Sequence, residues 1–292
     1  MAPHSEHLPI NPRNYDEFQS VVESIREQLG EDVAKAEIGI ICGSGLGPIG
    51  DAIEDAAILP YEKIPGFMKP KVPGHKGNLV FGTLAGKRVV ALQGRFHAYE
   101  HGMNLALCAL PVRVMAALGC KTLIASCAAG GVRPEYKVGE FMLIKDHISF
   151  PMLSGFSPLV GVSDRRFGEQ FVSLHQLYDK DLRQLAHEVA KKQTLVLHEG
   201  ILSQSGGPQY ETPAEVAALQ KLGVDCVGMS IAHEATVAKQ CHMKVLAFCL
   251  ITNKANLDAD ESELVSHMEV LEAAFRGGVL ATTFVRALVK EM

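Results

Sequence analysis

The sequence predicts an α/β protein with one domain, in which helices cover both faces of a mixed central β-sheet. Short apolar runs alternate with amphipathic helical patterns along the chain, and several of these runs are apolar at every position. Such strands are typical of a sheet that is covered on both faces. The apolar segments 79–84 and 88–95 are separated by three residues, which predicts an antiparallel hairpin and therefore a mixed sheet.

The composition excludes several classes of protein. The 292 residues are 47% apolar and 21% charged, which is ordinary for a folded domain and unlike a disordered chain. A net charge of -5 argues against a general nucleic-acid or membrane-surface binder. There is no signal-peptide core and no apolar run of about 18 residues. Seven cysteines without a C-x-x-C pair favour reduced thiols. We therefore expect a soluble, cytoplasmic protein.

The N-terminal part predicts an arm followed by a helix. Residues 1–13 are polar and contain three prolines, so we expect a loose arm ahead of a single domain that spans 14–292. Asn14 can cap the first helix, and Gly30 can end it. The helix has one apolar stripe, formed by Phe18, Val21, Val22, Ile25 and Leu29.

Apolar runs and turn residues predict the other strands and the middle helices. Further helices are expected at 105–119, where Pro111 either kinks the helix or marks its true start, and at 179–193. The strands expected, besides the hairpin, are 37–42, 121–128, 141–150, one that starts at 199, 226–229 and 244–253.

Two capping boxes predict the last helices. Thr212 and Glu215 form one, with proline at the first helical position, and the helix that follows should end at Gly223. Another helix is expected at about 233–241. A second capping box at 266–269 should open a C-terminal helix that runs nearly to the end of the chain.

A glycine-rich turn follows the first strand. Residues 43–47 read Gly-Ser-Gly-Leu-Gly, and such a turn lets backbone N–H groups converge on an anion while Ser44 adds a hydroxyl. The spacing fits neither a dinucleotide fingerprint nor a phosphate-binding P-loop. By itself the turn is as compatible with a structural role as with a binding role.

Residues 93–101 place Arg95, His97, Tyr99, Glu100 and His101 directly after a strand. Arginine and histidine here suit an anion site, because Arg binds phosphate oxygens bidentately. The order His-x-x-Glu-His also matches a zinc-protease motif, but that motif needs one helix to hold both histidines. A solvated loop is the plainer alternative.

Three more segments carry candidate polar residues, and one of them, 250–254, ends a strand at the edge where α/β sheets bind ligands. Tyr210 and Glu211 come just before a well-capped helix, where Glu211 could also simply complement the helix dipole. Asn253 ends an apolar strand, and it could equally be a turn residue. His267 opens the last helix, where a histidine is more often a cap or a surface residue.

Nine segments in order resemble the trimeric purine nucleoside phosphorylases, from about residue 30 to 290. They are ICGSGLG (41–47), VPGHKGNLVFG (72–82), QGRFHAYE (93–100), AAGG (128–131), VGEFMLIKDHI (138–148), RRFG (165–168), GGPQYET (206–212), LGVDCVGMS (222–230) and LITNK (250–254). The resemblance implies the nucleoside phosphorylase fold with its partly barrel-like sheet. It also implies phosphorolysis of inosine and guanosine or their deoxy forms to free base and (deoxy)ribose 1-phosphate, in purine salvage. Inorganic phosphate is then a co-substrate, with no metal and no other cofactor.

The resemblance also implies roles for particular residues. Asn253, Glu211 and His97 match the residues expected to carry the chemistry. Glu211 would accept N1–H of a 6-oxopurine while Asn253 holds N7 and O6. The phosphate ligands implied are Ser44, Arg95, His97, Ser230 and the backbone N–H of Ala128. The ribose and base contacts implied are Tyr99, Met229, His267 and Tyr210, with Phe167 from a neighbouring subunit of a homotrimer.

Two departures from the family pattern leave other readings open. Cys127 stands where the family usually has Asn, and residues 230–234 read Ser-Ile-Ala-His-Glu in place of Ser-Thr-Val-Pro-Glu. The alternatives are a paralogue that uses adenosine or methylthioadenosine and a weakly active nucleoside-binding protein. Asn253 and His267 favour 6-oxopurine nucleosides with a free 5′-hydroxyl.

Overall fold

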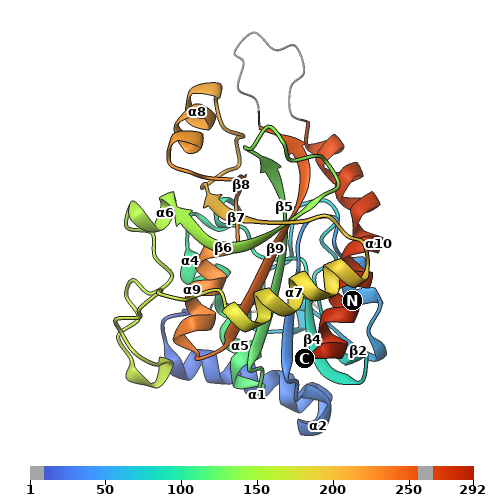
Figure 1. Cartoon of the computed structure of the whole chain (residues 1–292). Helices are drawn as coiled ribbons and strands as arrows, with labels where there is room; N and C mark the ends of the chain where they lie inside the picture. Colours follow the sequence, from blue (N-terminus) through green and yellow to red (C-terminus); the bar gives the residue numbers. More distant parts are fainter. Residues whose placement is uncertain (1–9, 256–265) are drawn as a thin grey trace.

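The computed structural model describes residues 10–255 and 266–292, and the structural statements below concern those residues. A mixed sheet of nine strands lies at the centre (Figure 1). The strands are β1 (Ile38–Cys42), β2 (Glu54–Pro60), β3 (Asn78–Leu84), β4 (Lys87–Gln93), β5 (Thr122–Gly131), β6 (Phe141–Ser149), β7 (Leu197–Gln204), β8 (Cys226–Gly228) and β9 (Lys244–Lys254). Their order is β2-β3-β4-β1-β5-β8-β7-β6-β9, and β5 also pairs with β9. Five strands therefore close into a ring, which confirms the predicted α/β fold with a partly barrel-like sheet.

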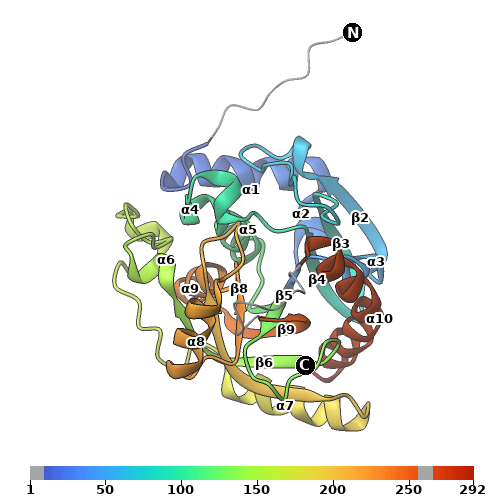
Figure 2. The same cartoon turned by 90° about the horizontal axis from the view of Figure 1, so that it is seen from above.

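Helices cover the sheet on two sides, and each side has its own apolar core. One core joins α1 and α5 with α9, while the other joins α3 and α7 with α10. Figure 2 shows the two groups on opposite sides of the strands. The helices are α1 (Tyr15–Leu29), α2 (Glu31–Ala34), α3 (Pro48–Asp51), α4 (Leu105–Cys108), α5 (Leu110–Ala117), α6 (Phe150–Leu153), α7 (Lys180–Lys192), α8 (Pro213–Lys221), α9 (Ala232–Gln240) and α10 (His267–Glu291), with 3₁₀ turns at η1 (Tyr61–Lys63), η2 (Ala98–His101) and η3 (Arg165–Phe167).

Local signals predicted most element boundaries. Asn14 caps α1 through its side chain, and the capping box of Thr212 and Glu215 opens α8. Pro111 marks a true helix start, because α4 ends at Cys108 and α5 begins one residue before the proline. The second predicted capping box is wrong: Ser266 precedes α10, but its side chain makes no capping hydrogen bond.

Part of the predicted N-terminal arm is packed against the domain. Residues 1–9 lie outside the described residues. From residue 10 onward the chain makes contacts: Pro12 is buried, and Arg13 Nε donates a hydrogen bond of 2.8 Å to the carbonyl of Val160. The edge strand β2 was not predicted, because polar and apolar residues do not alternate cleanly in its sequence. Most of its residues are exposed or half-buried. Among the described helices, none combines the length and the apolar character needed to cross a membrane.

The sheet topology gathers the polar segments at one edge. β1 is parallel to β4 and to β5, and β5 is parallel to β9. The carboxyl ends of parallel strands meet at the same edge of a sheet, where α/β proteins bind ligands. Ser44 and Arg95 directly follow β1 and β4, and Asn253 lies opposite Gly130 near the ends of β9 and β5. The predicted site residues are therefore brought together from distant parts of the sequence.

Candidate active site

The glycine-rich turn after β1 lies directly against β5. A Cβ atom on Gly43 would lie 2.6 Å from the carbonyl oxygen of Ser126 and 2.8 Å from Cα of Cys127, so only glycine fits without a backbone shift. The Ser126 hydroxyl donates to the carbonyl of Ile41 at 2.9 Å, and the N–H of Gly43 donates to that same hydroxyl at 3.3 Å. These contacts hold the backbone of the turn and place Ser44 at the edge of the sheet.

Arg95 lies under this turn and is paired with a buried carboxylate. Its Nε and Nη2 each donate to Glu234 at 3.0 Å, and its Nη1 donates to the carbonyl of Ser126 at 2.7 Å. Both side chains are 1% exposed. Three of the five N–H donors of Arg95 are thus used within the chain. The fork expected to hold phosphate holds Glu234 instead, so a bound anion could use only the two N–H groups that remain.

The charge on this pair is maintained by mutual stabilisation. Burial raises the pKa of Glu234, but the nearby Arg95 guanidinium and its hydrogen bonds outweigh burial, so the pKa is lowered overall. Burial lowers the pKa of Arg95, but the charge and hydrogen bonds of Glu234 outweigh burial, so this pKa is raised overall. Both groups are therefore charged at neutral pH, and the pair adds no net charge to the site.

A row of aromatic rings leads away from the turn. Ser44 Oγ lies 3.1 Å from Nε2 of His75, whose ring stacks on His97 with centroids 5.2 Å apart. His97 in turn stacks on Tyr99 at 5.0 Å, and its Nδ1 lies 3.4 Å from a carboxylate oxygen of Glu100. Burial lowers the pKa of His75 to about 3 and also lowers that of His97. Both rings are therefore neutral at pH 7, and each can offer one donor and one acceptor.

Sequence reasoning missed His75 as a site residue. It occurs in a segment that resembles the family, but it lies about 20 residues before the Arg-His segment and far from the other candidates in the chain. A signal was present, because His75 lies in a turn with Gly74 and Gly77 on either side, just before β3. Only the fold shows that its ring lies between Ser44 and His97.

The start of α9 contributes Ser230, which is 5% exposed. The residue after it, Ile231, has φ 84° and ψ −52° although it is β-branched, which is a costly backbone conformation. Glu234, the partner of Arg95, lies in the first turn of the same helix. One short segment therefore carries both Ser230 and the anchor of Arg95.

The expected ribose contacts lie beside the ring stack. A Cβ atom on Gly207 would lie 2.5 Å from Sδ of Met229 and 2.8 Å from Cδ1 of Tyr99, so these two side chains meet at that glycine. Burial, followed by the charge of Glu100, raises the pKa of Tyr99 to about 12. Tyr99 is therefore a neutral hydroxyl at physiological pH.

The expected base contacts come from two segments. Asn253 Nδ2 donates to the carbonyl of Lys254 at 3.2 Å, and its Oδ1 accepts from the hydroxyl of Thr252 at 3.1 Å. Tyr210 is 36% exposed and Glu211 is partly exposed in the loop before α8. The carboxylate of Glu211 makes no hydrogen bond with the described residues, so it can accept one from a ligand.

The structure does not bear out the expected position of Phe167. This ring is 6% exposed and is packed inside its own chain against Tyr15, at 5.1 Å, and Phe18, at 5.5 Å, with the Arg113 guanidinium 4.6 Å from its centre. Within this chain, the N-terminal helix and Arg113 cover the ring. Phe171, four residues later, is 87% exposed. The side chain of His267 lies outside what the structure describes.

The zinc-protease alternative has no support from geometry. His97 precedes a short 3₁₀ turn, and His101, on that turn, packs its ring on Phe96 at 5.6 Å. The described residues include no group of three or more histidine, cysteine, aspartate or glutamate side chains arranged to hold a metal ion.

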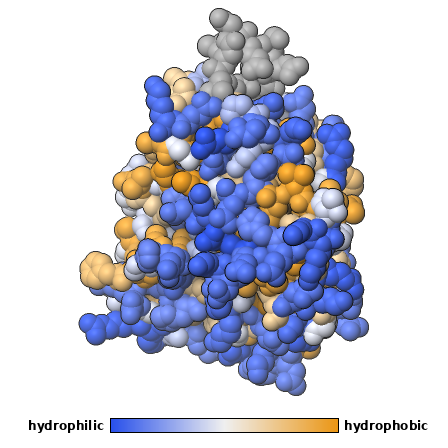
Figure 3. Space-filling view, viewed as in Figure 1, coloured by the Kyte–Doolittle hydropathy of each residue, from blue (hydrophilic) through white to orange (hydrophobic). Residues whose placement is uncertain are grey.

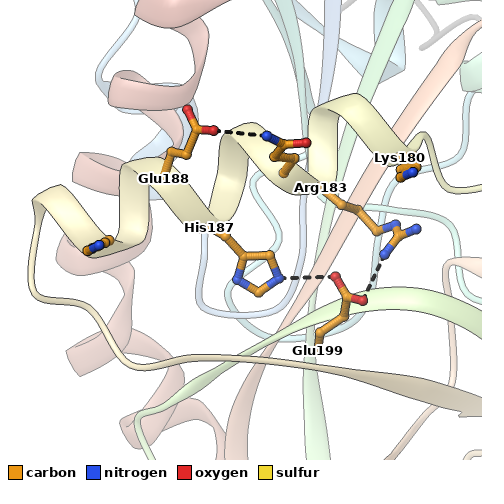
Figure 4. Close-up of a pocket in the computed structure, with 7 residues that line it drawn as sticks. Lys180, Arg183, His187, Glu188 and Glu199 are labelled. Atoms are coloured by element: carbon orange, nitrogen blue, oxygen red, sulfur yellow. Dashed lines mark hydrogen bonds and ion pairs between the residues drawn. The ribbon is translucent and has the colours of Figure 1, made fainter.

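A separate hollow lies on α7, away from the sheet edge that carries these residues. Arg183 and His187 point from the helix toward Glu199 on β7 and pair with it at 2.8 and 3.0 Å (Figure 4). Gln184 donates to Glu188 on the same helix at 3.2 Å. Because these polar groups already bind one another, we assign no ligand to this hollow.

Comparison with known proteins agrees with this fold and this arrangement. The phosphorylase superfamily matches residues 37–290. Purine nucleoside phosphorylase of Anopheles gambiae is 42% identical, covering 99% of this chain and 81% of its own. That of Bos taurus is 41% identical, over 96% of each chain. Solved structures of Schistosoma mansoni purine nucleoside phosphorylase, one with inosine and one with adenosine, each superpose with a TM-score of 0.90 at 41% identity, covering 96% of this chain and 98% of theirs.

The fold and the superfamily match define a nucleoside phosphorylase. At about 40% identity over nearly the whole length, the chain belongs to the purine nucleoside phosphorylases of the phosphorylase superfamily. It is therefore an enzyme that transfers the pentosyl group of a purine nucleoside to phosphate.

Proposed function

We propose that this enzyme prefers 6-oxopurine nucleosides, inosine and guanosine with their deoxy forms, and releases the free base and (deoxy)ribose 1-phosphate in purine salvage. The observation that carries this proposal is the asparagine at the end of β9, at position 253. An amide can donate to O6 or N7 of the base, whereas an aspartate would accept from the 6-amino group of adenine.

Phosphate would bind between the glycine-rich turn and the start of α9. The donors available there are the hydroxyls of Ser44 and Ser230, the backbone N–H of Ala128, the neutral rings of His75 and His97, and the two remaining N–H groups of Arg95. Ala128 supports this position, because it is partly exposed in a strand whose neighbouring positions are buried. A dianion held by fixed N–H and O–H groups is positioned for attack on the anomeric carbon.

The leaving base would be stabilised as it gains electron density. Glu211 accepts the N1–H of the base, and Asn253 donates to N7 or O6, where negative charge develops in the transition state. Tyr210 stacks on the base, while Tyr99 and Met229 contact the ribose. His267 would lie near the 5′-hydroxyl. Departure of the base and attack of phosphate then proceed through a ribose with oxocarbenium character.

The experiment that tests the activity measures hypoxanthine release from inosine with and without phosphate. Phosphate-dependent release, with ribose 1-phosphate as the second product, is the expected result. Equal release without phosphate would mean hydrolysis and would contradict the assignment of the phosphate site. The preference is tested by comparing kcat/KM for inosine, guanosine, adenosine and methylthioadenosine, and a higher value for either of the last two would contradict it.

We also propose that the enzyme is a homotrimer. Exposed apolar side chains gather in the segment 150–171, and in Figure 3 apolar residues reach the surface on the side of the molecule where α6 lies. They are Phe150, Leu153, Phe156, Val160 and Phe171. This segment would contact a neighbouring copy, with Phe171 rather than Phe167 reaching the other subunit. Light scattering of the purified protein tests this, and a monomer at micromolar concentration would contradict it.

We further propose that the enzyme is cytoplasmic. All seven cysteines are free and six of them are buried. Cys127 and Cys249 lie side by side, but their sulfur atoms are 3.4 Å apart, whereas a disulfide bond is about 2.05 Å long. Free thiols of this kind are typical of a reducing compartment. Subcellular fractionation tests this assignment.

A further inference from the structure

Two buried polar side chains near the phosphate site have no role in the proposed mechanism. Gln204 is the last residue of β7, and His233 is the second residue of α9. Both are fully buried, with an exposed fraction of 0%. Polar groups that are buried this completely require a structural or functional reason.

The contacts define how the pair is hydrogen-bonded. Gln204 Oε1 accepts the backbone N–H of Ala232 at 2.9 Å, and Gln204 Nε2 lies 3.2 Å from Nδ1 of His233. Gln204 Oε1 also lies 3.4 Å from the same ring nitrogen, and the shorter contact assigns Nε2 as the donor and Nδ1 as the acceptor. Burial lowers the pKa of His233 to about 4, so the ring is neutral and can accept in this way. Its Nε2 has no hydrogen-bond partner within the described residues.

The pair supports the strained backbone at Ile231. The carbonyl of Ile231 accepts from the N–H of Ala235 at 2.8 Å, and the next N–H, that of Ala232, is the one bound by Gln204. A β-branched residue at positive φ persists only where its surroundings hold it. Without Gln204, the N–H of Ala232 would be a buried donor with no partner, and the start of α9 would relax.

That relaxation would reach the phosphate site on two sides. Ser230 immediately precedes the strained residue, and Glu234, which holds Arg95 through two bonds of 3.0 Å, lies three residues after it. At the end of β7, the residue after Gln204 is Ser205, whose N–H donates to the carbonyl of Gly228 at 2.8 Å. Gln204 therefore connects the end of β7 to the segment that carries Ser230.

We propose that Gln204 and His233 are positioning residues that hold the start of α9, so that Ser230 and Arg95 are in place for phosphate. Gln204 binds the helix backbone, and His233 orients the amide of Gln204. This inference rests on the proposed phosphate site and adds to it the two residues that set its geometry. Neither side chain is proposed to touch a substrate.

The test compares variants of the full-length enzyme in phosphate binding, measured by calorimetry without nucleoside, and in KM for phosphate and for inosine. Gln204→Met keeps the approximate volume and loses both hydrogen bonds, and it should weaken phosphate binding about tenfold. The KM for inosine should change less than phosphate binding, because Met229 is the one proposed base or ribose contact that adjoins the start of α9. His233→Leu should act in the same direction.

Two further variants separate positioning from general stability. His233→Asn places an amide oxygen near the position of Nδ1, so phosphate affinity should recover to near the wild-type value. Gln240→Met is the matched control, since Gln240 is a buried glutamine at the other end of α9 whose Nε2 donates to the carbonyl of Glu169 at 2.8 Å. It should lower the melting temperature and leave phosphate affinity unchanged.

Several results would overturn the proposal. These are wild-type phosphate affinity in folded Gln204→Met, equal affinities in His233→Asn and His233→Leu, or an equal loss in Gln240→Met. If the wild type cleaves inosine without phosphate while the variants still differ in phosphate affinity as expected, the proposed function fails and the positioning role stands. If the wild type requires phosphate and the variants bind it normally, the function stands and the positioning role fails. A wild type that does not bind phosphate contradicts both.

Discussion

Replacing Glu234 by glutamine removes the charge that Arg95 faces in the core and keeps the shape of the side chain. Arg95 and Glu234 are each 1% exposed and are joined by two hydrogen bonds of 3.0 Å. Breaking a buried ion pair by removing one partner costs about 3–5 kcal/mol, because the other charge stays buried without compensation. The glutamine oxygen can still accept one hydrogen bond, so we expect a loss near the lower end, about 3 kcal/mol.

This loss corresponds to a large shift in thermal unfolding. For a domain of this size, each kcal/mol lowers Tm by about 2–4 °C, so Glu234→Gln should unfold about 6–12 °C below the wild type in phosphate-free buffer. Added phosphate should raise the Tm of the variant more than that of the wild type. The anion offers Arg95 the negative charge that the substitution removed.

Glu54→Gln is the matched control for this measurement. Glu54 pairs with Arg286, and both side chains are about half exposed, at 50% and 51%. Exposed ion pairs contribute at most about 1 kcal/mol, so this variant should lose less than about 4 °C. Equal losses in Glu234→Gln and Glu54→Gln would refute the reasoning. So would a Glu234→Gln variant whose Tm does not respond to phosphate while that of the wild type does.

Three other measurements test the remaining features. Burial lowers the pKa of His75 to about 3 and that of His233 to about 4. Below about pH 6.5 the unfolded chain therefore binds more protons than the folded protein does. The free energy of unfolding, measured with urea, should therefore be constant with respect to these two groups above that pH and fall as the pH is lowered toward 4. His233→Asn should reduce the slope of this free energy against pH by up to about 1.4 kcal/mol per pH unit. An unchanged slope would count against the buried neutral ring. Asn253→Ala should lower kcat/KM for inosine more than about a hundredfold, or about 2.7 kcal/mol, while Asn253→Asp shifts the preference toward adenosine; wild-type rates on inosine in both would disprove the base-site assignment. Phe171→Ala should weaken self-association and raise the KM for inosine, whereas Phe167→Ala should mainly lower Tm, and the reverse pattern would restore the sequence-based assignment.

The sequence by itself determined the class of fold and most of its elements. Asn14, Pro111 and the capping box at Thr212 act through neighbouring residues, so their effects can be read locally. Apolar runs identified the buried strands for the same reason. The edge strand β2 and the short helices lacked such patterns and were missed. The segments that carry the chemistry were also recognisable, because their polar residues interrupt apolar strands at the ends.

Only the tertiary structure decided which of these residues meet. Arg95 and Glu234 are 139 residues apart in the chain, and no local signal pairs them. The same holds for His75 and Ser44, and for Phe167, which the N-terminal helix covers so that Phe171 is the ring left exposed. Parallel strands bring Ser44 and Arg95 to one edge of the sheet, whereas Phe167 is covered by the packing of α1. Strand pairing is set by packing across the whole domain, and a sequence read residue by residue does not contain it.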